Sequence, residues 1–417
     1  MSEFLIRGGR KLKGELMVQS SKNACLPLIA ATLLTEDPVR LKSIPNISDI
    51  RKMLELYKHI GGNVLFDGED VILCSKNVNT TNISSNLVGE IRSSIFLLGP
   101  MLAKYKKAEI AYPGGCKIGA RPIDLHLKGF ESFGVQIKNL EKGVVCEASK
   151  ITGGIFHLDF PSVGATENLI MLGTLSVGER FIISNAAREP EIVDLANFIN
   201  EMGGKVYGAG TSLITIEGVE KLHGVDYKPI NDRIVTGTYM IATAMAGGNV
   251  VLKNSNSEYL YSLILKLRNS GCKIGVKNDI IKIESFRRAI SCPIINTQPY
   301  PGFPTDLQAQ MLSLQTVASG VSVVTENLFE SRFNHVSELV KMGAKILLQD
   351  RVAIINGVDR LKGATVHAQD LRGGAALVLA GLVAEGQTIV KDINYIERGY
   401  VAIDEELNQL GAHIERR

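Results

Sequence analysis

Apolar positions gather in six stretches of about a dozen residues, rich in Ala and Leu, at similar intervals along the chain. These stretches cover residues 23–34, 91–103, 165–177, 233–246, 305–318 and 372–384. Each is apolar nearly all round, as helices enclosed by other elements are. A short, mostly β-branched or hydrophobic segment follows each of them, at residues 39–41, 108–111, 181–184, 249–252, 321–325 and 388–391. The pattern predicts six buried helices, each followed by a strand.

A second series of helices alternates with the first and is amphipathic. In one of them Ile192, Leu195 and Ile199 share a helical face. Each pattern ends at a glycine, a common helix terminus because glycine adopts the left-handed conformation at little cost. The glycines stand at positions 61, 134, 203, 271, 343 and 411. A strand, a turn and a strand follow each of them, except that the last repeat ends after its first strand. This near-constant spacing predicts six repeated α/β units of about 70 residues.

Six repeats divide naturally into two domains of three. We place one domain at residues 22–229 and the other at residues 1–21 together with 230–417, because the last repeat lacks a final strand that the N-terminal strand can supply. The predicted fold class is therefore α/β, with strands covering buried helices in both domains. The active site is expected in the cleft between them.

Composition narrows the function classes. The 417 residues carry 46 basic and 43 acidic side chains, and a net charge of +3 is too small to predict a nucleic-acid surface. No apolar run is long enough to span a bilayer, and the N-terminus lacks the apolar segment of a signal peptide. The six cysteines and seven histidines show no metal-ligand spacing. We expect a cytoplasmic protein with reduced thiols and with no nucleic-acid, membrane or metal partner.

Basic residues recur where loops enter helices. The set comprises Lys22, Arg92, Arg121, Arg188, Arg233, Arg332, Arg372 and Arg398. Any one of them is explained more simply by a helix start or a surface ion pair. Together, at equivalent points of the repeats, they suit a substrate with several phosphates or carboxylates, which guanidinium groups bind through paired hydrogen bonds.

One loop differs from its equivalents in the other repeats. Residues 112–122 contain three glycines and two prolines, and Cys116 is followed there by the basic residues Lys117 and Arg121. This glycine content predicts a mobile loop, and the basic neighbours favour the thiolate form of Cys116. A reactive thiol and a structural one are equally compatible with the pattern. The other five cysteines fall in helix or strand patterns and are expected in the cores.

Asp306 is the strongest candidate for a general base. It follows Pro301, Gly302 and Pro304 in a loop that these residues stiffen, and it is expected to face the cationic cleft. There it would stay ionised and accept a proton from a hydroxyl. The alternative is a helix N-cap, which aspartate fills well, and the two roles are compatible.

Several of these segments together resemble one family. They read SKNA from Ser21, PGGCKIGARPIDLHL from Pro113, PSVGAT from Pro161, AAREPEIVD from Ala186, GFPTDLQ from Gly302, ESRFNH from Glu330, DLR from Asp370 and ERGY from Glu397. The chain is similar, from residue 3 to its end, to the UDP-N-acetylglucosamine 1-carboxyvinyltransferases, the enolpyruvyl transferases that open peptidoglycan synthesis. The resemblance implies two inverse α/β prisms, each with three repeats.

The resemblance also implies a reaction and its residues. The enolpyruvyl group of phosphoenolpyruvate would pass to the 3′-hydroxyl of UDP-N-acetylglucosamine by addition and elimination, with phosphate released and no metal or organic cofactor. The implied catalytic residues are Cys116, Asp306, Lys22, Arg398 and Asp370, with Arg332 in support. Phosphoenolpyruvate would contact Lys22, Asn23, Arg121, Arg372 and Arg398. The UDP-sugar would contact Asn23, Arg92, Arg121, Pro122, Ile123, Asp124, Leu125, Phe160, Pro161, Ser162, Val163, Asp306 and Leu328.

Two further points follow from the resemblance. Phe160 and Pro161 replace a Lys-Val pair found in some members, which bears on contacts with the uracil. The epoxide antibiotic fosfomycin is expected to alkylate Cys116. The rival interpretations are the enolpyruvyl transferase of the shikimate pathway, whose family lacks the PGGC loop, and a non-catalytic anion-binding paralogue.

Overall fold

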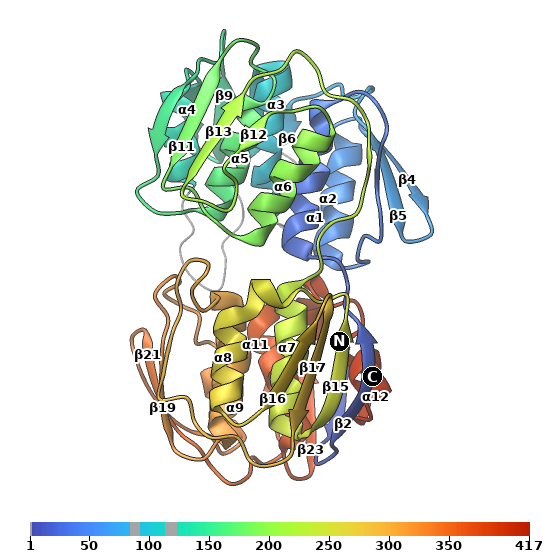
Figure 1. Ribbon diagram of the computed structural model, residues 1–417, viewed down its shortest axis with the longest axis vertical. Coiled ribbons are helices and arrows are strands. Elements are labelled where there is room, and N and C mark those ends of the chain that lie inside the picture. The colour runs from blue at the N-terminus through green and yellow to red at the C-terminus, as the bar shows by residue number, and fades with distance from the viewer. Residues whose placement is uncertain (1, 84–91, 113–122) are drawn as a thin grey trace. The chain divides into compact units, whose positions relative to one another are not determined.

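The structure is a computed structural model that describes residues 2–83, 92–112 and 123–417. The chain divides into two compact units, with boundaries between residues 19 and 20 and between residues 230 and 231. The described residues from 20 to 230 form one unit, which we call the N-proximal unit. Residues 2–19 and 231–417 form the other, which we call the C-proximal unit. In Figure 1 the N-proximal unit runs from blue to green, and the C-proximal unit from yellow-green to red together with the dark blue N-terminal segment.

Each unit contains three four-stranded sheets built to one plan. A strand that precedes a buried helix pairs in parallel with the strand that follows such a helix, and two further antiparallel strands complete the sheet. The N-proximal sheets have the orders β14-β3-β5-β4, β6-β7-β9-β8 and β10-β11-β13-β12, and the C-proximal sheets β16-β17-β15-β2, β18-β19-β21-β20 and β22-β23-β1-β24. This sixfold recurrence confirms the predicted fold class of two α/β units with three repeats each.

The strands have the following bounds. In the N-proximal unit they are β3 (Val39–Leu41), β4 (Asn63–Asp67), β5 (Asp70–Cys74), β6 (Asn82–Ile83), β7 (Lys107–Ala111), β8 (Gln136–Leu140), β9 (Gly143–Glu147), β10 (Gly154–His157), β11 (Arg180–Ser184), β12 (Val206–Tyr207), β13 (Leu213–Glu217) and β14 (Asp226–Tyr227). In the C-proximal unit they are β1 (Glu3–Arg7), β2 (Leu12–Met17), β15 (Gly248–Lys253), β16 (Lys273–Lys277), β17 (Ile280–Ser285), β18 (Ile294–Asn296), β19 (Val321–Thr325), β20 (Lys345–Gln349), β21 (Val352–Asn356), β22 (Thr365–His367), β23 (Gln387–Lys391) and β24 (Ile414–Arg416).

The helices form the centre of each unit and the outer layer between sheets. The central helices are α1 (Lys22–Ala31), α3 (Leu98–Tyr105), α5 (Val163–Gly173), α7 (Arg233–Ala246), α9 (Gln308–Val317) and α11 (Leu371–Val383). The amphipathic helices are α2 (Ser48–His59), α4 (Asp124–Ser132), α6 (Pro190–Glu201), α8 (Tyr261–Asn269), α10 (Val336–Lys341) and α12 (Ile403–Gln409). Short 3-10 helices include η1 (Thr32–Leu34), η3 (Arg92–Leu97), η4 (Ser257–Leu260), η5 (Thr305–Leu307) and η6 (Ile393–Arg398).

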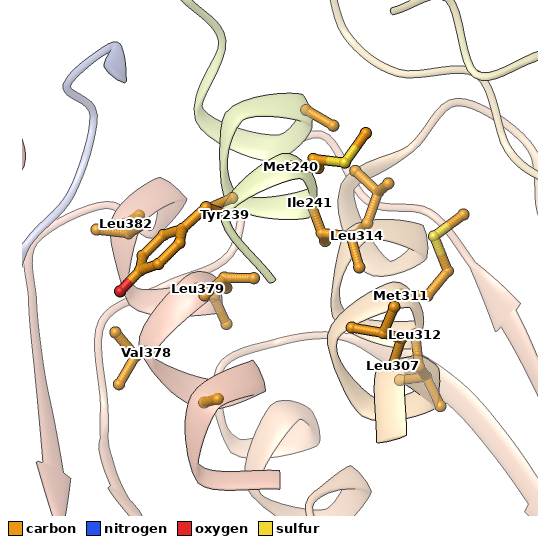
Figure 2. Close-up of a cluster of buried hydrophobic side chains, with 14 of the residues drawn as sticks. Tyr239, Met240, Ile241, Leu307, Met311, Leu312, Leu314, Val378, Leu379 and Leu382 are labelled. Carbon is orange, nitrogen blue, oxygen red and sulfur yellow. The ribbon is translucent and has the colours of Figure 1, made fainter. Parts of the chain in front are cut away.

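The core of the C-proximal unit lies between α7, α9 and α11. Every residue of α7 from Arg233 to Ala244 is buried, which is why its sequence is apolar on nearly all sides. Figure 2 shows Met240 and Ile241 of α7 next to Leu314 of α9, while Tyr239 faces Leu382 of α11. The three helices thus pack against one another, and the sheets cover the sides of each helix that do not contact another helix.

Two strands that precede central helices lie in a different unit from the helix that follows them. The N-terminal strand β1 completes the sixth sheet by pairing with β23 and β24, as predicted. The next strand, β2, precedes α1 but pairs in parallel with β15 of the C-proximal unit (Figure 1). Conversely, β14 precedes α7 but pairs with β3 of the N-proximal unit. Each of the two segments that pass from one unit to the other therefore follows a strand anchored in the unit that it leaves.

Three of the predicted central helices contain a 3-10 segment: the stretch at residues 23–34 ends in η1, and two others begin with one. The stretch at residues 91–103 forms η3 and then α3, and the stretch at 305–318 forms η5 and then α9. At the junction of η3 and α3 the backbone N–H of Gly99 donates to Asn168 Oδ1 at 2.7 Å, and Pro100 has no N–H to donate. The α-helical ladder is therefore interrupted where the apolar pattern predicts one continuous helix.

The six spaced glycines close the amphipathic helices as predicted. All have positive φ, between 89° at Gly134 and 99° at Gly61. After α2, for example, the N–H of Gly61 donates to the carbonyl of Lys58 and the N–H of Gly62 to that of Tyr57. These left-handed turns reverse the chain from helix to strand in every repeat.

One of these glycines provides a clean test of backbone strain. A Cβ at Gly343 would meet no atom within 4 Å, so Gly343→Ala adds only the cost of a left-handed L-residue at φ +90°. We expect the free energy of unfolding to fall by about 1–2 kcal/mol in urea denaturation. Gly275 in β16 has equal space and no left-handed φ. Gly275→Ala should therefore stay within about 0.5 kcal/mol of wild type, and an equal loss in both variants would exclude this explanation.

Candidate active site

The N-terminal ends of the three central helices in the C-proximal unit each carry an aspartate. Asp232 caps α7, because its Oδ1 accepts hydrogen bonds from the N–H groups of Ile234 at 2.9 Å and Val235 at 3.0 Å. Asp370 caps α11 in the same way, through the N–H groups of Arg372 at 3.0 Å and Gly373 at 2.9 Å. Two of the three equivalent carboxylates thus accept hydrogen bonds from the first backbone N–H groups of the helices that they cap.

Asp306, the third of these aspartates, is held by two arginines instead. Its Oδ1 accepts from Arg332 Nη2 at 2.6 Å, and its Oδ2 accepts from Arg372 Nη2 at 2.8 Å. The N-cap positions of η5 and α9 are Pro304 and Leu307, and neither makes a side-chain capping hydrogen bond. The N-cap alternative is therefore wrong for Asp306. The physical reason is that two buried cations compete for this carboxylate more strongly than backbone N–H groups do.

The burial of these three side chains is unequal. The side chains of Arg332 and Arg372 are 3% and 4% exposed, whereas that of Asp306 is 25% exposed. Burial is the largest single influence on the pKa of Arg372 and lowers it, but the charges of Asp306, Tyr400 and Asp232 and the hydrogen bond to Asp306 together raise it by more, so the pKa lies above its usual value. The guanidinium group of Arg372 therefore remains charged. The carboxylate between the two arginines is the member of the cluster that solvent or a substrate reaches.

Glu326 fixes the loops on both sides of this cluster. It is fully buried. Its Oε2 accepts from the Thr305 hydroxyl at 2.9 Å, and its Oε1 from the Thr297 hydroxyl and the Leu328 N–H, both at 2.9 Å. It thereby ties the residue before Asp306 to the loop that leads to Arg332. Sequence reasoning missed Glu326, although a carboxylate directly after the apolar strand β19 was a usable signal.

A buried histidine lies beside the start of α11. His335 is 2% exposed, and within the described residues neither of its ring nitrogens has a hydrogen-bond partner. Burial lowers the pKa of His335 well below its usual value, so the ring is neutral at pH 7. Its Cβ and the carboxylate of Asp370 both pack against Gly373, where an added Cβ would lie 3.1 Å and 2.8 Å from them. A side chain at position 373 would displace either group.

Two other predicted residues of the C-proximal unit lie in the same connecting segments. Leu328 is half-buried in the loop between β19 and α10, two residues after Glu326. Arg398 ends η6 and is also half-buried, two residues before the buried Tyr400. The structure thus brings Asp306, Arg332 and Arg372 into direct contact, places Asp370 at the start of the helix that carries Arg372, and leaves Leu328 and Arg398 on neighbouring loops.

The equivalent helix ends of the N-proximal unit begin differently. Ser21 caps α1 by accepting the N–H of Ala24 at 3.4 Å, and Ser162 caps α5 by accepting the N–H of Ala165 at 3.4 Å. Lys22, the first residue of α1, places its Nζ 3.3 Å from Asp49 Oδ2, and both side chains are largely buried. Asn23 follows, half-buried. The ammonium group is thus held in a defined position by a carboxylate of α2.

The remaining predicted residues of this unit lie at helix starts. Arg92 begins η3, Asp124 begins α4, and Val163 begins α5. Ile123 and Leu125 pack partly against the core, and Pro161 and Ser162 are half-buried. Phe160 is 47% exposed. Cys116, Arg121 and Pro122, and most of the loop at 112–122, lie outside the described residues.

The other cysteines have mostly the predicted surroundings. Cys25, Cys146, Cys272 and Cys292 are buried. Burial raises the pKa of Cys146 to about 12 and that of Cys272 to about 11. Cys74 is only half-buried, because it ends β5 at the edge of the core, so its prediction as a core residue is wrong in part.

Across the described helices, none combines the length and apolar character needed to span a membrane.

Comparisons with known proteins agree with this architecture. The family model described as EPSP synthase (3-phosphoshikimate 1-carboxyvinyltransferase) matches residues 6–407. The enolpyruvyl transferase NikO from Streptomyces tendae is similar in structure, with a TM-score of 0.89, 23% identity, and coverage of 100% of this chain and 98% of that one. An EPSP synthase from Acinetobacter baumannii has a TM-score of 0.78 at 18% identity, with 100% of both chains covered. These two likenesses establish the fold.

Sequence identity narrows the family. A protein of Caldanaerobacter subterraneus subsp. tengcongensis named UDP-N-acetylglucosamine 1-carboxyvinyltransferase 2 is 48% identical over 416 residues, which cover 100% of both chains. Such identity over the whole length leaves no domain unmatched. The chain therefore belongs to the UDP-N-acetylglucosamine 1-carboxyvinyltransferases, within the wider EPSP synthase family of enolpyruvyl transferases.

Proposed function

We propose that this chain transfers the enolpyruvyl group of phosphoenolpyruvate to the 3′-hydroxyl of UDP-N-acetylglucosamine, the step that commits the sugar to peptidoglycan synthesis. The observation that carries the proposal is Asp306, an accessible carboxylate fixed between two buried arginines. A base oriented in this way suits deprotonation of a hydroxyl beside an anionic co-substrate. Family membership gives the proposal its substrates.

The basic side chains bind phosphoenolpyruvate, which carries a phosphate and a carboxylate. We assign this role to Lys22, Arg121, Arg372 and Arg398, with Asn23 as a hydrogen-bond donor. Lys22 is positioned by Asp49, and Arg372 by Asp306. Fixed cations stabilise the phosphate as it leaves, without having to reorganise during the reaction.

The reaction proceeds by addition and elimination. In the addition, the 3′-oxygen loses its proton to Asp306 and bonds to C2 of phosphoenolpyruvate, while C3 gains a proton and becomes a methyl group. In the elimination, C3 loses a proton, the double bond re-forms, and the bond from C2 to the bridging oxygen breaks. Phosphate therefore leaves with the bridging oxygen, and the enolpyruvyl ether of the UDP-sugar remains. Atoms and charges balance without an external oxidant or reductant.

Cys116 and Asp370 act at the other end of the intermediate. We assign the Cys116 thiol a place near C3, where it serves as an acid, forms a covalent adduct and assists product release. Asp370 supports that end, since its carboxylate is fixed at the start of α11. Arg332 keeps Asp306 oriented from the opposite side to Arg372.

The UDP-sugar contacts come from helix starts and loops. In our proposal they are Asn23, Arg92, Arg121, Pro122, Ile123, Asp124, Leu125, Phe160, Pro161, Ser162, Val163, Asp306 and Leu328. The exposed ring of Phe160 is the most distinctive of them, because it offers an apolar surface on which a base can stack.

We also propose a cytoplasmic location, where thiols stay reduced. No disulfide joins the described cysteines.

A phosphate-release assay distinguishes the proposal from its nearest rival. Purified chain is mixed with phosphoenolpyruvate and either UDP-N-acetylglucosamine or shikimate 3-phosphate. We expect steady release only with the UDP-sugar. Release with shikimate 3-phosphate alone would assign the chain to the rival reaction, and release with neither acceptor would favour a non-catalytic paralogue.

A further inference from the structure

We infer that Tyr400 is a positioning residue for Asp306 and that it acts through Arg372. The inference rests on the proposed function, in which Asp306 is the base. Tyr400 lies after η6 and is 2% exposed, so it is shielded from solvent. Its hydroxyl oxygen is 3.5 Å from Arg372 Nη1, and its ring centroid is 5.8 Å from the guanidinium carbon of Arg372. Tyr400 thus contacts the guanidinium group that holds the carboxylate.

The hydrogen bonds around Tyr400 fix which atoms donate. The Thr238 hydroxyl donates to the carbonyl of Ile234 at 2.8 Å, within α7. The only hydrogen of that hydroxyl is thereby used, so at the 2.9 Å contact between Thr238 and Tyr400 the tyrosine must be the donor. Gln310 Nε2, an obligatory donor, lies 3.2 Å from Thr238 Oγ1 and 3.3 Å from the Tyr400 hydroxyl.

This assignment directs the lone pairs of Tyr400 toward Arg372. Since the hydroxyl hydrogen of Tyr400 points to Thr238, its oxygen is free to accept from Gln310 and from Arg372 Nη1. Arg372 is then held at both ends of its guanidinium group, by Tyr400 through Nη1 and by Asp306 through Nη2. A planar group fixed at two points has one orientation, and it transmits that orientation to the carboxylate.

The second arginine of the cluster has fewer fixed contacts. Arg332 donates to Asp306 through Nη2, and its guanidinium carbon lies 5.3 Å from the ring centroid of Phe329. Within the described residues its Nε and Nη1 have no hydrogen-bond partner. Among the described contacts, Arg372 is therefore the more firmly anchored of the two arginines that hold Asp306. Three residues connect Arg372 to the packing of the core. They are Thr238 on α7, Gln310 on α9 and Tyr400 after η6.

The test compares two buried tyrosines of the same unit. Tyr400→Phe removes the hydroxyl that accepts from Arg372 and keeps the ring. Tyr239→Phe is the matched control, because Tyr239 is 1% exposed and its hydroxyl donates to Glu406 rather than to the Arg372 network. Its ring lies between α7 and α11 (Figure 2). Both variants lose a buried hydroxyl, and both should unfold at a lower temperature than wild type.

Only Tyr400→Phe should change catalysis. In the phosphate-release assay, run well below both unfolding temperatures, we expect its kcat to fall about tenfold while both KM values change less than about twofold. Tyr239→Phe should keep the wild-type kcat. In an Arg372→Lys background the further effect of Tyr400→Phe should vanish, because the group through which it acts has been replaced.

The outcomes separate the inference from the proposed function. Wild-type kcat in Tyr400→Phe, an equal loss in Tyr239→Phe, or the same tenfold loss in the Arg372→Lys background would each overturn the role of Tyr400 while leaving the function standing. A wild-type chain that releases no phosphate with the UDP-sugar would overturn the proposed function, and this inference with it.

Discussion

Asp306→Asn should reduce kcat by about a thousandfold while both substrates still bind, because an amide cannot take the proton of the 3′-hydroxyl. The amide oxygen can accept from one arginine as Asp306 does now, but the amide nitrogen then faces the other, since both carboxylate oxygens are engaged. A moderate loss of stability should accompany the loss of turnover. Steady-state kinetics, with binding of the UDP-sugar measured by calorimetry, separates the two effects.

A second aspartate paired with an arginine provides the control. Asp404 is buried and accepts from Arg416 Nη2 at 2.7 Å and from its Nε at 3.0 Å, at the start of α12. Asp404→Asn should lower stability and leave kcat within about threefold of wild type. If Asp306→Asn behaved in the same way as Asp404→Asn, Asp306 would be a structural residue and not the base.

Fosfomycin should inactivate the wild-type chain almost completely and leave its label on Cys116 alone. The epoxide is opened by a thiolate, and the buried cysteines are poor sources of one. With a pKa of about 12, Cys146 is ionised at pH 7 to only about one part in 10⁵. Cys25, Cys272 and Cys292 are likewise buried. Intact-mass and peptide mass spectrometry would identify the labelled residue.

Two variants complete the fosfomycin test. Cys116→Asp should not be labelled. Cys74→Ser removes the half-buried cysteine and should be labelled and inactivated as fast as wild type. A label found on Cys74, or inactivation of Cys116→Asp at the wild-type rate, would contradict the assignment of the reactive thiol.

Much of the fold follows from the apolar pattern and the spaced glycines. The helix at 233–246 and the strands at 39–41 and 321–325 have the predicted bounds, because a fully apolar helix and a short β-branched strand each have few alternatives. The pairing of β2 with β15 and of β14 with β3 was not predicted. Both strands precede equivalent central helices, so local sequence cannot choose between two equivalent partners, and only the long-range path of the chain decides.

The candidate site was predictable in its parts but not in its connections. Helix starts marked Asp306, Arg332 and Arg372 separately, but 26 and 66 residues separate the arginines from the aspartate, and no periodic pattern shows that both reach one carboxylate. Glu326 and Tyr400 were missed because attention to basic residues at helix starts overlooks buried groups that orient them. Such groups lie one contact away from the charges that sequence patterns reveal.

The proposed enolpyruvyl transfer to the UDP-sugar breaks the bond between C2 and the bridging oxygen of phosphoenolpyruvate. Phosphoenolpyruvate labelled with ¹⁸O at the bridging position tests it directly, with UDP-N-acetylglucosamine as acceptor. We predict that mass spectrometry will find the label in the released phosphate and an unlabelled enolpyruvyl ether on the sugar. Label retained in pyruvate, with the sugar unchanged, would show simple hydrolysis of the phosphate ester and contradict the account.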